Sequence, residues 1–311
     1  MDSQGNPATL MEAIKFFSNP ETCFWFVAEM RWPKGVECPR CGGGGFSFLK
    51  TRMMFKCKTC TKQYSVKVGT IFEDSPVGLD KWMTAMWMMS NCKNGVSSCE
   101  IARSIGVTQK SAWFMLHRIR RVMKTGSFTK LAGEVEADET FIGGKARNMH
   151  TNVKARRITG TGTKDKTAVM GLLERGGEVR VGVVANRRKS VLQAEVRQHV
   201  EVGAALYTDA LLSYDGLAGD YAHAVVDHAI EYVSGRVHTN GLENFWSLLK
   251  RGLNGTYVSV EPFHLDRYLD EQTFRYNNRK NMSDGDRFVK ALGGIGGKRL
   301  TLAELTGKAV N

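Results

Sequence analysis

The chain has 311 residues, of which 42% are hydrophobic and 24% charged, a composition that excludes a mostly disordered or collagen-like protein. At roughly 150 residues per domain, this length suggests two or three domains. No segment approaches the roughly 18 apolar residues of a membrane span, and the N-terminus lacks the pattern of a signal peptide. We therefore expect a cytoplasmic protein.

The charge is strongly positive and unevenly distributed. Lys and Arg number 44 against 31 Asp and Glu, giving a net charge of +13 and a pI near 9.5. Residues 79–133 contain nine basic and two acidic residues, and no carboxylate occurs between Glu100 and Glu134. A basic surface can serve solubility alone, but clustering and a pI above about 9 favour a nucleic-acid partner.

Residues 1–35 are predicted to be an N-terminal helical segment with two short helices between residues 9 and 31. Leu10, Ile14 and Phe17 recur at helical spacing and would share one face of the first helix.

Two cysteine pairs, each with two residues between its members, are separated by 15 residues in the region 36–72. This spacing is typical of a structural zinc site, in which four thiolates close a tetrahedron around one Zn²⁺. Two disulfides are the alternative, which is disfavoured because nothing indicates secretion. We predict a zinc ribbon whose ligands are Cys38, Cys41, Cys57 and Cys60.

Residues 79–125 are predicted to be helical and to contain a helix-turn-helix. Gly106 permits the turn, and Thr108 can cap a second helix over 109–121. The beginning of a recognition helix meets DNA base edges. The alternative is a plain helical hairpin that links two domains. The residues predicted to contact DNA here are Gln109, Lys110, Ser111 and Arg118.

From residue 133 the pattern changes to alternating strands and helices, and we assign 133–285 to one α/β domain with a mixed sheet. Strands are predicted at 134–140, 167–173, 179–186, 204–209 and 224–226, and helices at 191–200, 239–250 and 264–278. Gly176 and Gly177 mark a hairpin turn.

Two other segments of the chain are predicted to lack regular structure. Residues 145–166 contain seven Lys or Arg and one Asp. They would form a solvated loop or a clamp on the phosphate backbone, with Arg156 and Arg157 contacting DNA. The glycine-rich residues 286–311 are expected to be a flexible tail.

Three carboxylates are candidate catalytic residues: Asp138 in a predicted strand, Asp209 at the end of a later strand, and Glu243 early in a predicted helix. A ribonuclease-H-like core gathers three carboxylates in this order. Hard oxygen ligands suit Mg²⁺ or Mn²⁺, and two such ions can catalyse phosphoryl displacement.

Each carboxylate also has a structural alternative. If the strand register slips by one residue, Glu139 replaces Asp138 as the inward carboxylate. Asp209 could merely cap a turn, and Glu243 could be favoured by the helix dipole. His238 and Asn240 precede Glu243 and could orient water or DNA, although Asn240 could equally cap the helix.

Motifs along most of residues 20–280 resemble DDE transposases of the IS1595 family, in its ISXO2-like branch. They are RWPKG followed by CPRC and CKTC, then VEADETFIGGK, YTDALLSY, HTNGLENFWSLLKRGLNGTY and HLDRYLDEQTFRYNNR. The segment from His238 to Arg251 is specific to this family, whereas the zinc ribbon alone would not be.

The resemblance implies that Asp138, Asp209 and Glu243 form the catalytic triad. It implies that Lys250, seven residues after Glu243 and on the same helix face, touches a DNA phosphate beside Arg251. Two Mg²⁺ or Mn²⁺ ions and one structural Zn²⁺ would be the cofactors. The partners would be double-stranded DNA, at terminal inverted repeats and at the target, and a second copy of the chain in a homodimer or larger synaptic complex.

The sequence therefore predicts a DNA transposase of a bacterial insertion sequence that cleaves and transfers strands. Two alternatives stay open. One is a zinc-ribbon DNA-binding regulator with an inactive catalytic domain, and the other is a ribonuclease-H-like nuclease without strand transfer.

Overall fold

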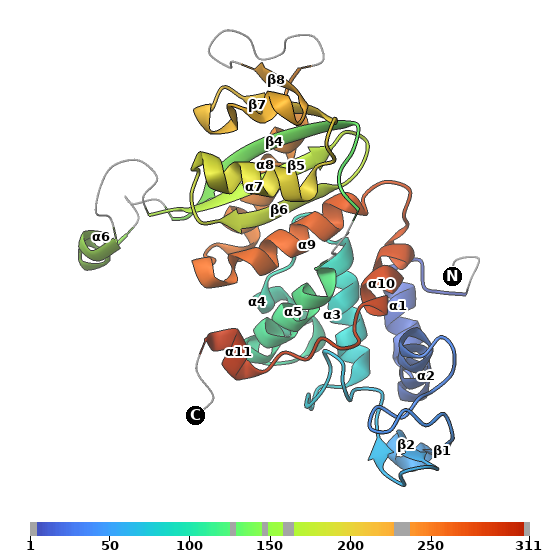
Figure 1. Ribbon diagram of the computed structural model, residues 1–311. Coiled ribbons are helices and arrows are strands. Elements are labelled where there is room, and N and C mark those ends of the chain that lie inside the picture. Colours follow the sequence, from blue (N-terminus) through green and yellow to red (C-terminus); the bar gives the residue numbers. More distant parts are fainter. Residues whose placement is uncertain (1–4, 125–128, 145–148, 158–164, 227–236, 308–311) are drawn as a thin grey trace. The chain divides into compact units, whose positions relative to one another are not determined.

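The computed structural model of the chain describes residues 5–124, 129–144, 149–157, 165–226 and 237–307 (Figure 1). The chain divides into two compact units, of which unit 1 comprises residues 1–124 and 278–311, and unit 2 comprises residues 125–277. No helix in the described part of the chain combines the length and the apolar character needed to cross a membrane.

Unit 1 consists of helices and one small sheet. Its helices are α1 (Leu10–Phe17), α2 (Pro20–Arg31), α3 (Leu79–Asn91), α4 (Ser98–Ile105), α5 (Gln109–Met123), α10 (Asp284–Gly293) and α11 (Leu302–Thr306). The antiparallel sheet has the order β1 (Phe46–Leu49), β2 (Met54–Cys57), β3 (Gln63–Tyr64). It includes one of the four paired cysteines, at the end of β2.

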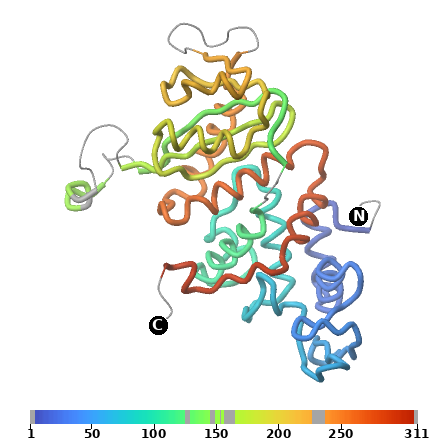
Figure 2. Tube along the Cα trace, viewed as in Figure 1, coloured from blue at the N-terminus to red at the C-terminus, as the bar shows by residue number. Residues whose placement is uncertain are grey.

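The C-terminal segment of unit 1 differs from the predicted flexible tail. A capping box between Ser283 and Asp286 begins α10, and Phe288 from this helix is fully buried against the rings of Phe17 and Trp87. Figure 2 shows α10 and the described residues after it lying alongside the helices of residues 79–123. The prediction was wrong because the glycines at 293–297 follow an amphipathic helix that buries its apolar face.

Helices α4 and α5 are joined by a short turn, as the sequence predicts. Gly106 adopts φ +62°, the left-handed conformation that glycine accepts without strain, and Thr108 caps α5 by accepting from the backbone N–H of Ser111. Ala112 and Leu116, on the inward face of α5, are buried. The second helix of this pair extends to Met123, two residues beyond the predicted end.

Unit 2 is built on a five-stranded mixed sheet with the order β6-β5-β4-β7-β8. Its strands are β4 (Glu134–Ile142), β5 (Thr167–Glu174), β6 (Val179–Val184), β7 (Ala205–Asp209) and β8 (Ala222–Val226). Strands β4, β5 and β6 pair antiparallel, whereas β7 runs parallel to both β4 and β8. The mixed α/β fold predicted for this region is thereby confirmed.

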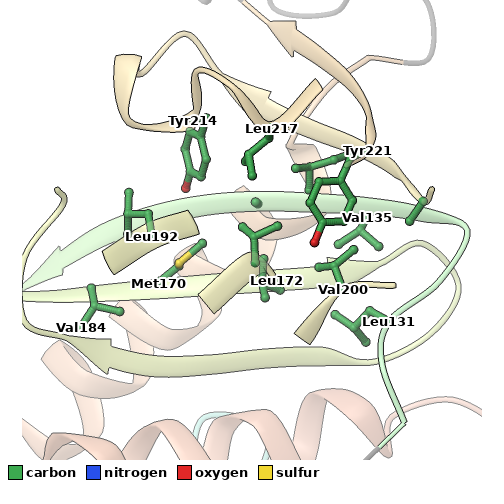
Figure 3. Packing of buried hydrophobic residues seen from close by; sticks show 14 of the residues in the cluster. Leu131, Val135, Met170, Leu172, Val184, Leu192, Val200, Tyr214, Leu217 and Tyr221 are labelled. Atoms are coloured by element: carbon green, nitrogen blue, oxygen red, sulfur yellow. The ribbon is translucent and has the colours of Figure 1, made fainter. Parts of the chain in front are cut away.

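Helices cover both faces of this sheet. On one face, α7 (Lys189–His199) packs Leu192 and Val196 over Met170 and Leu172, with Tyr214 at the edge of the same core (Figure 3). On the other face, α8 (Asn240–Arg251) and α9 (Leu265–Asn277) pack over a second core. Successive residues of β4 therefore face two different cores.

The basic segment 145–166 is not entirely a loop, because residues Thr151–Arg157 form helix α6. Residues 145–148 and 158–164 lie outside the described residues. A π-helix at Gly252–Tyr257 follows α8 directly.

Candidate catalytic site and zinc centre

The four paired cysteines come together at the small sheet of unit 1. Their sulfur atoms all lie within 4.8 Å of one another, with 3.7 Å between the Sγ atoms of Cys38 and Cys60 and 3.6 Å between those of Cys41 and Cys57. A tetrahedron with Zn–S bonds of about 2.3 Å has edges of about 3.8 Å, so this arrangement fits one Zn²⁺.

The backbone around these cysteines favours thiolates. The backbone N–H of Cys60 donates to Cys57 Sγ over 3.4 Å and is the largest of the effects that lower the pKa of Cys57 to about 6. The thiolate is the form that binds metal, so local hydrogen bonding prepares this residue as a ligand.

In unit 2, β4 places Asp138 on the face of the sheet that α8 covers. Asp138 Oδ2 accepts a 2.9 Å hydrogen bond from Trp246 Nε1, and Oδ1 accepts one of 2.8 Å from the backbone N–H of Glu139. Asp209 ends β7, the strand parallel to β4, and its Oδ1 accepts from the backbone N–H of Leu211. Glu243 is exposed in the first turn of α8.

Asp138 is within electrostatic reach of both other predicted catalytic carboxylates, Asp209 and Glu243. The pKa of Asp138 is raised to about 6, chiefly by burial; the negative charges of Asp209 and Glu243 contribute to this rise, and the hydrogen bond from Trp246 opposes it. Among the residues that the structure describes, however, the cysteine group is the only set of three potential ligands within 4.8 Å. The oxygen atoms of Asp138, Asp209 and Glu243 are therefore not all close enough to one another to bind a single ion together.

Glu139 is a fourth carboxylate of this site, on the opposite face of β4. Its Oε2 accepts a 2.8 Å hydrogen bond from the Tyr214 hydroxyl, and Oε1 lies 3.6 Å from Arg187 Nη1. Burial raises the pKa of Glu139 to about 7, and Asp209 and Asp138 add to the shift. Sequence reasoning treated Glu139 only as a substitute for Asp138, whereas the structure places both beside Asp209.

The contact between Asp138 and Trp246 depends on Gly171. This glycine of β5 pairs directly with Asp138, and a Cβ built on it would lie 2.7 Å from the Trp246 indole and 2.9 Å from Leu242. Any larger residue at position 171 would therefore push α8 or its indole away from β4.

Lys250 and Arg251 are exposed in the last turn of α8. Lys250 also lines a cavity of about 170 Å³ between the end of β4, at Phe141 and Ile142, and the π-helix with the residues that follow it. Asn240 is the first residue of α8 and is exposed, whereas the cap position belongs to Thr239.

The residues predicted to contact DNA in unit 1 divide into two groups. Gln109 and Lys110 are exposed at the beginning of α5, with Ser111 half-buried beside them. Arg118 is buried instead, with 4% of its surface exposed, and donates to the backbone carbonyls of Leu300, Ile71 and Glu73. The predicted DNA contact of Arg118 is therefore wrong, because its guanidinium holds loops of unit 1 together.

Arg156 and Arg157 end α6, but their side chains lie outside the described residues.

Two regions of the chain are similar to known transposase domains. Residues 130–277 match the ISXO2-like transposase domain family, and residues 18–63 match the transposase zinc-ribbon domain family. An uncharacterized protein in transposable element ISH50 of Halobacterium salinarum is 29% identical over 272 residues, which span 83% of this chain and 91% of that protein. An uncharacterized transposase-like protein of Haemophilus influenzae is 31% identical over 97 residues, which span 31% of this chain and 78% of that protein. The chain therefore belongs to the ISXO2-like transposases of the IS1595 family and carries the zinc ribbon of that family.

Proposed function

We propose that this transposase cuts the ends of a bacterial insertion sequence and joins them to target DNA, with Asp138, Asp209 and Glu243 as its catalytic carboxylates. The observation that carries the proposal is that Asp138 on β4 lies close enough to Asp209, at the end of parallel β7, and to Glu243, on α8, for both to act on its carboxylate electrostatically. Strand, strand end and helix are the elements from which a ribonuclease-H-like core would present them.

The donor set fits divalent cations. Carboxylate oxygens are the ligands that Mg²⁺ and Mn²⁺ prefer. Burial is the main cause of the raised pKa values of Asp138 and Glu139, and the neighbouring carboxylates add to both shifts. Bound at Asp138, Asp209 and Glu243, two such ions would supply an activated nucleophile and stabilisation of the leaving oxygen.

Exposed basic and polar residues outside the carboxylate group would bind and orient DNA. Lys250 and Arg251, exposed in the last turn of the helix that carries Glu243, would hold a phosphate near the carboxylates. In unit 1, α4 and α5 would act as a helix-turn-helix, with Gln109 and Lys110 at the terminal inverted repeats and the zinc ribbon beside them. Joining two ends requires at least a dimer in the synaptic complex.

A strand-transfer assay tests this function. The zinc-loaded protein is incubated with labelled element-end DNA, a target plasmid and Mg²⁺, beside Asp209→Asn and the control Asp215→Asn, which alters an exposed carboxylate six residues away. Joined product from wild type and control, absent with Asp209→Asn, supports the proposal. Cutting without joining indicates the nuclease, and DNA binding without cutting indicates the regulator.

A further inference from the structure

A single arginine contacts β4, β7 and the residue His238 that precedes α8, the three parts of the chain that carry or lead into the proposed catalytic carboxylates. Arg175 directly follows β5, at the hairpin turn before β6, and its backbone N–H donates to the carbonyl of Glu134 at the start of β4. Its side chain is 18% exposed and points back over the sheet rather than into solvent.

The guanidinium of Arg175 makes a different contact with each of these three parts of the chain. On β4, its Nε donates to Oε1 of Glu136, a carboxylate with 1% of its side chain exposed, over 2.9 Å. On β7, its Cζ lies 4.4 Å from the centroid of the Tyr207 ring, in cation–π geometry. Before α8, its Nη2 donates to the carbonyl of His238 over 2.8 Å and lies 3.0 Å from His238 Nδ1.

Each contacted residue is close in the chain to one catalytic carboxylate. Glu136 lies two residues before Asp138 and on the same strand face, and Tyr207 lies two residues before Asp209 on β7. His238 lies five residues before Glu243. A movement of Arg175 would therefore displace the backbone segments that carry all three carboxylates.

Glu136 extends this connection to the helix itself. Its Oε2 accepts a 3.0 Å hydrogen bond from the backbone N–H of Leu242, the residue before Glu243. Gly241 makes room for this contact, because a Cβ there would lie 2.7 Å from Glu136 Oε2 and 2.3 Å from Leu173 Cδ2. The carboxylate of Glu136 thus joins Arg175 to the first turn of α8.

We propose that Arg175 is a positioning residue that sets the relative placement of Asp138, Asp209 and Glu243 for divalent cations. The inference rests on the proposed function in taking these carboxylates as the metal site. Arginine suits this role because its planar fork reaches a carboxylate, a ring face and a carbonyl together. The ammonium of lysine would keep the charge but could hold only part of this set.

The test uses full-length, zinc-loaded protein with the substitution Arg175→Lys. The control is Arg197→Lys, which alters an exposed arginine of α7 that pairs with Asp220. Mn²⁺ binding is measured by calorimetry in the absence of DNA. We expect the dissociation constant to rise about 10- to 100-fold in Arg175→Lys, as for loss of an outer-shell partner, and to stay at the wild-type value in the control. In strand transfer, kcat should fall while KM for DNA is unchanged.

A second variant distinguishes loss of the Arg175 contacts from misfolding of Arg175→Lys. Tyr207→Leu removes the ring face under Arg175 and leaves the arginine in place, and it should weaken Mn²⁺ binding in the same direction. Wild-type Mn²⁺ affinity in folded Arg175→Lys would overturn the proposal, as would a failure of both variants to fold. Arg175-dependent Mn²⁺ binding without any strand transfer by wild type would sink the proposed function alone. A wild-type protein that binds no Mn²⁺ would overturn both.

Discussion

Trp246 donates a hydrogen bond of 2.9 Å from its indole Nε1 to Oδ2 of Asp138, and so connects the helix that carries Glu243 to the strand that carries Asp138. The two catalytic carboxylates proposed on these elements are therefore held in relation by a side chain that is neither acidic nor basic. The bond also favours the ionised form of Asp138, which is the form that binds a cation.

Trp246→Phe should raise the pKa of Asp138 above its value of about 6, because the hydrogen bond that lowers this pKa is lost. The acid limb of the strand-transfer pH profile should then move to higher pH. The cost in free energy of unfolding should be about 1 kcal/mol, since a ring is retained and one hydrogen bond is removed.

The control for this substitution is Trp82→Phe in unit 1, where the indole donates to Ser75 Oγ over 3.2 Å. It should cost similar stability and leave the pH profile in place. An unchanged profile in Trp246→Phe would contradict the role assigned to the indole.

The raised pKa of Asp138 predicts a specific pH dependence of stability. The folded protein holds this proton with a pKa of about 6, against 3.8 in the unfolded chain, so the stabilisation is fully present below about pH 3.8 and is lost as pH rises through 6. Between pH 5 and pH 8, the free energy of unfolding of wild type should fall by about 1.4 kcal/mol relative to that of Asp138→Asn, because the asparagine has no proton to lose.

Urea unfolding of both proteins, zinc-loaded and without added Mg²⁺, measures this difference. Added Mg²⁺ should reduce it, because a bound cation offsets the repulsion that ionisation creates. Parallel pH dependences for the two proteins would argue against the burial of an ionisable Asp138.

Replacing one zinc ligand should unfold the ribbon. Cys57→Ser removes a sulfur from the group of four, and Phe55 on the same strand would lose its packing against Phe24 and Tyr64. Zinc binding contributes on the order of 10 kcal/mol to the folding of such small metal sites. We expect released zinc in a colorimetric assay and a lower melting temperature, whereas Cys99→Ser, at an exposed cysteine outside the group, should change neither.

Arg118→Met should destabilise unit 1 by about 3 kcal/mol, because the carbonyls of Leu300, Ile71 and Glu73 lose a buried donor. Thermal and urea unfolding would measure this loss. Lys110→Ala, at the exposed beginning of α5, should leave stability within about 0.5 kcal/mol and weaken DNA binding in a salt-dependent manner. If Arg118→Met were as stable as wild type but bound DNA more weakly, Arg118 would be a DNA contact after all.

Local patterns in the sequence were sufficient for most elements of unit 2. The strand predicted at 134–140 is β4, and the helix predicted at 239–250 is α8, each within two residues at either end. Gly176, at φ +80°, forms the predicted turn between β5 and β6. These elements are long or strongly periodic, or are bounded by glycine, so the signals lie within a few neighbouring residues. The ribonuclease-H-like and helix-turn-helix assignments stay predictions.

The residues that sequence reasoning missed are defined by contacts between distant segments. Arg118 binds carbonyls 45 to 182 residues away, so nothing near it distinguishes it from an exposed arginine on a basic helix. Arg175, beside a glycine turn, likewise has the local pattern of an ordinary surface residue. Its contacts with Glu136 and Tyr207 follow only from the register of β4 with β5 and from the parallel pairing of β4 with β7.

The proposed function requires Asp138, Asp209 and Glu243 to act as one site. The decisive measurement is strand transfer by Asp138→Asn, Asp209→Asn and Glu243→Gln, each assayed at saturating element-end DNA with Mg²⁺ and with Mn²⁺. We predict that each variant folds and binds DNA as wild type does. We also predict that the joined product falls by more than the roughly 10- to 100-fold that is typical when a residue supporting a metal ligand is replaced. Joined product near the wild-type level from any one of the three would contradict the proposed catalytic site.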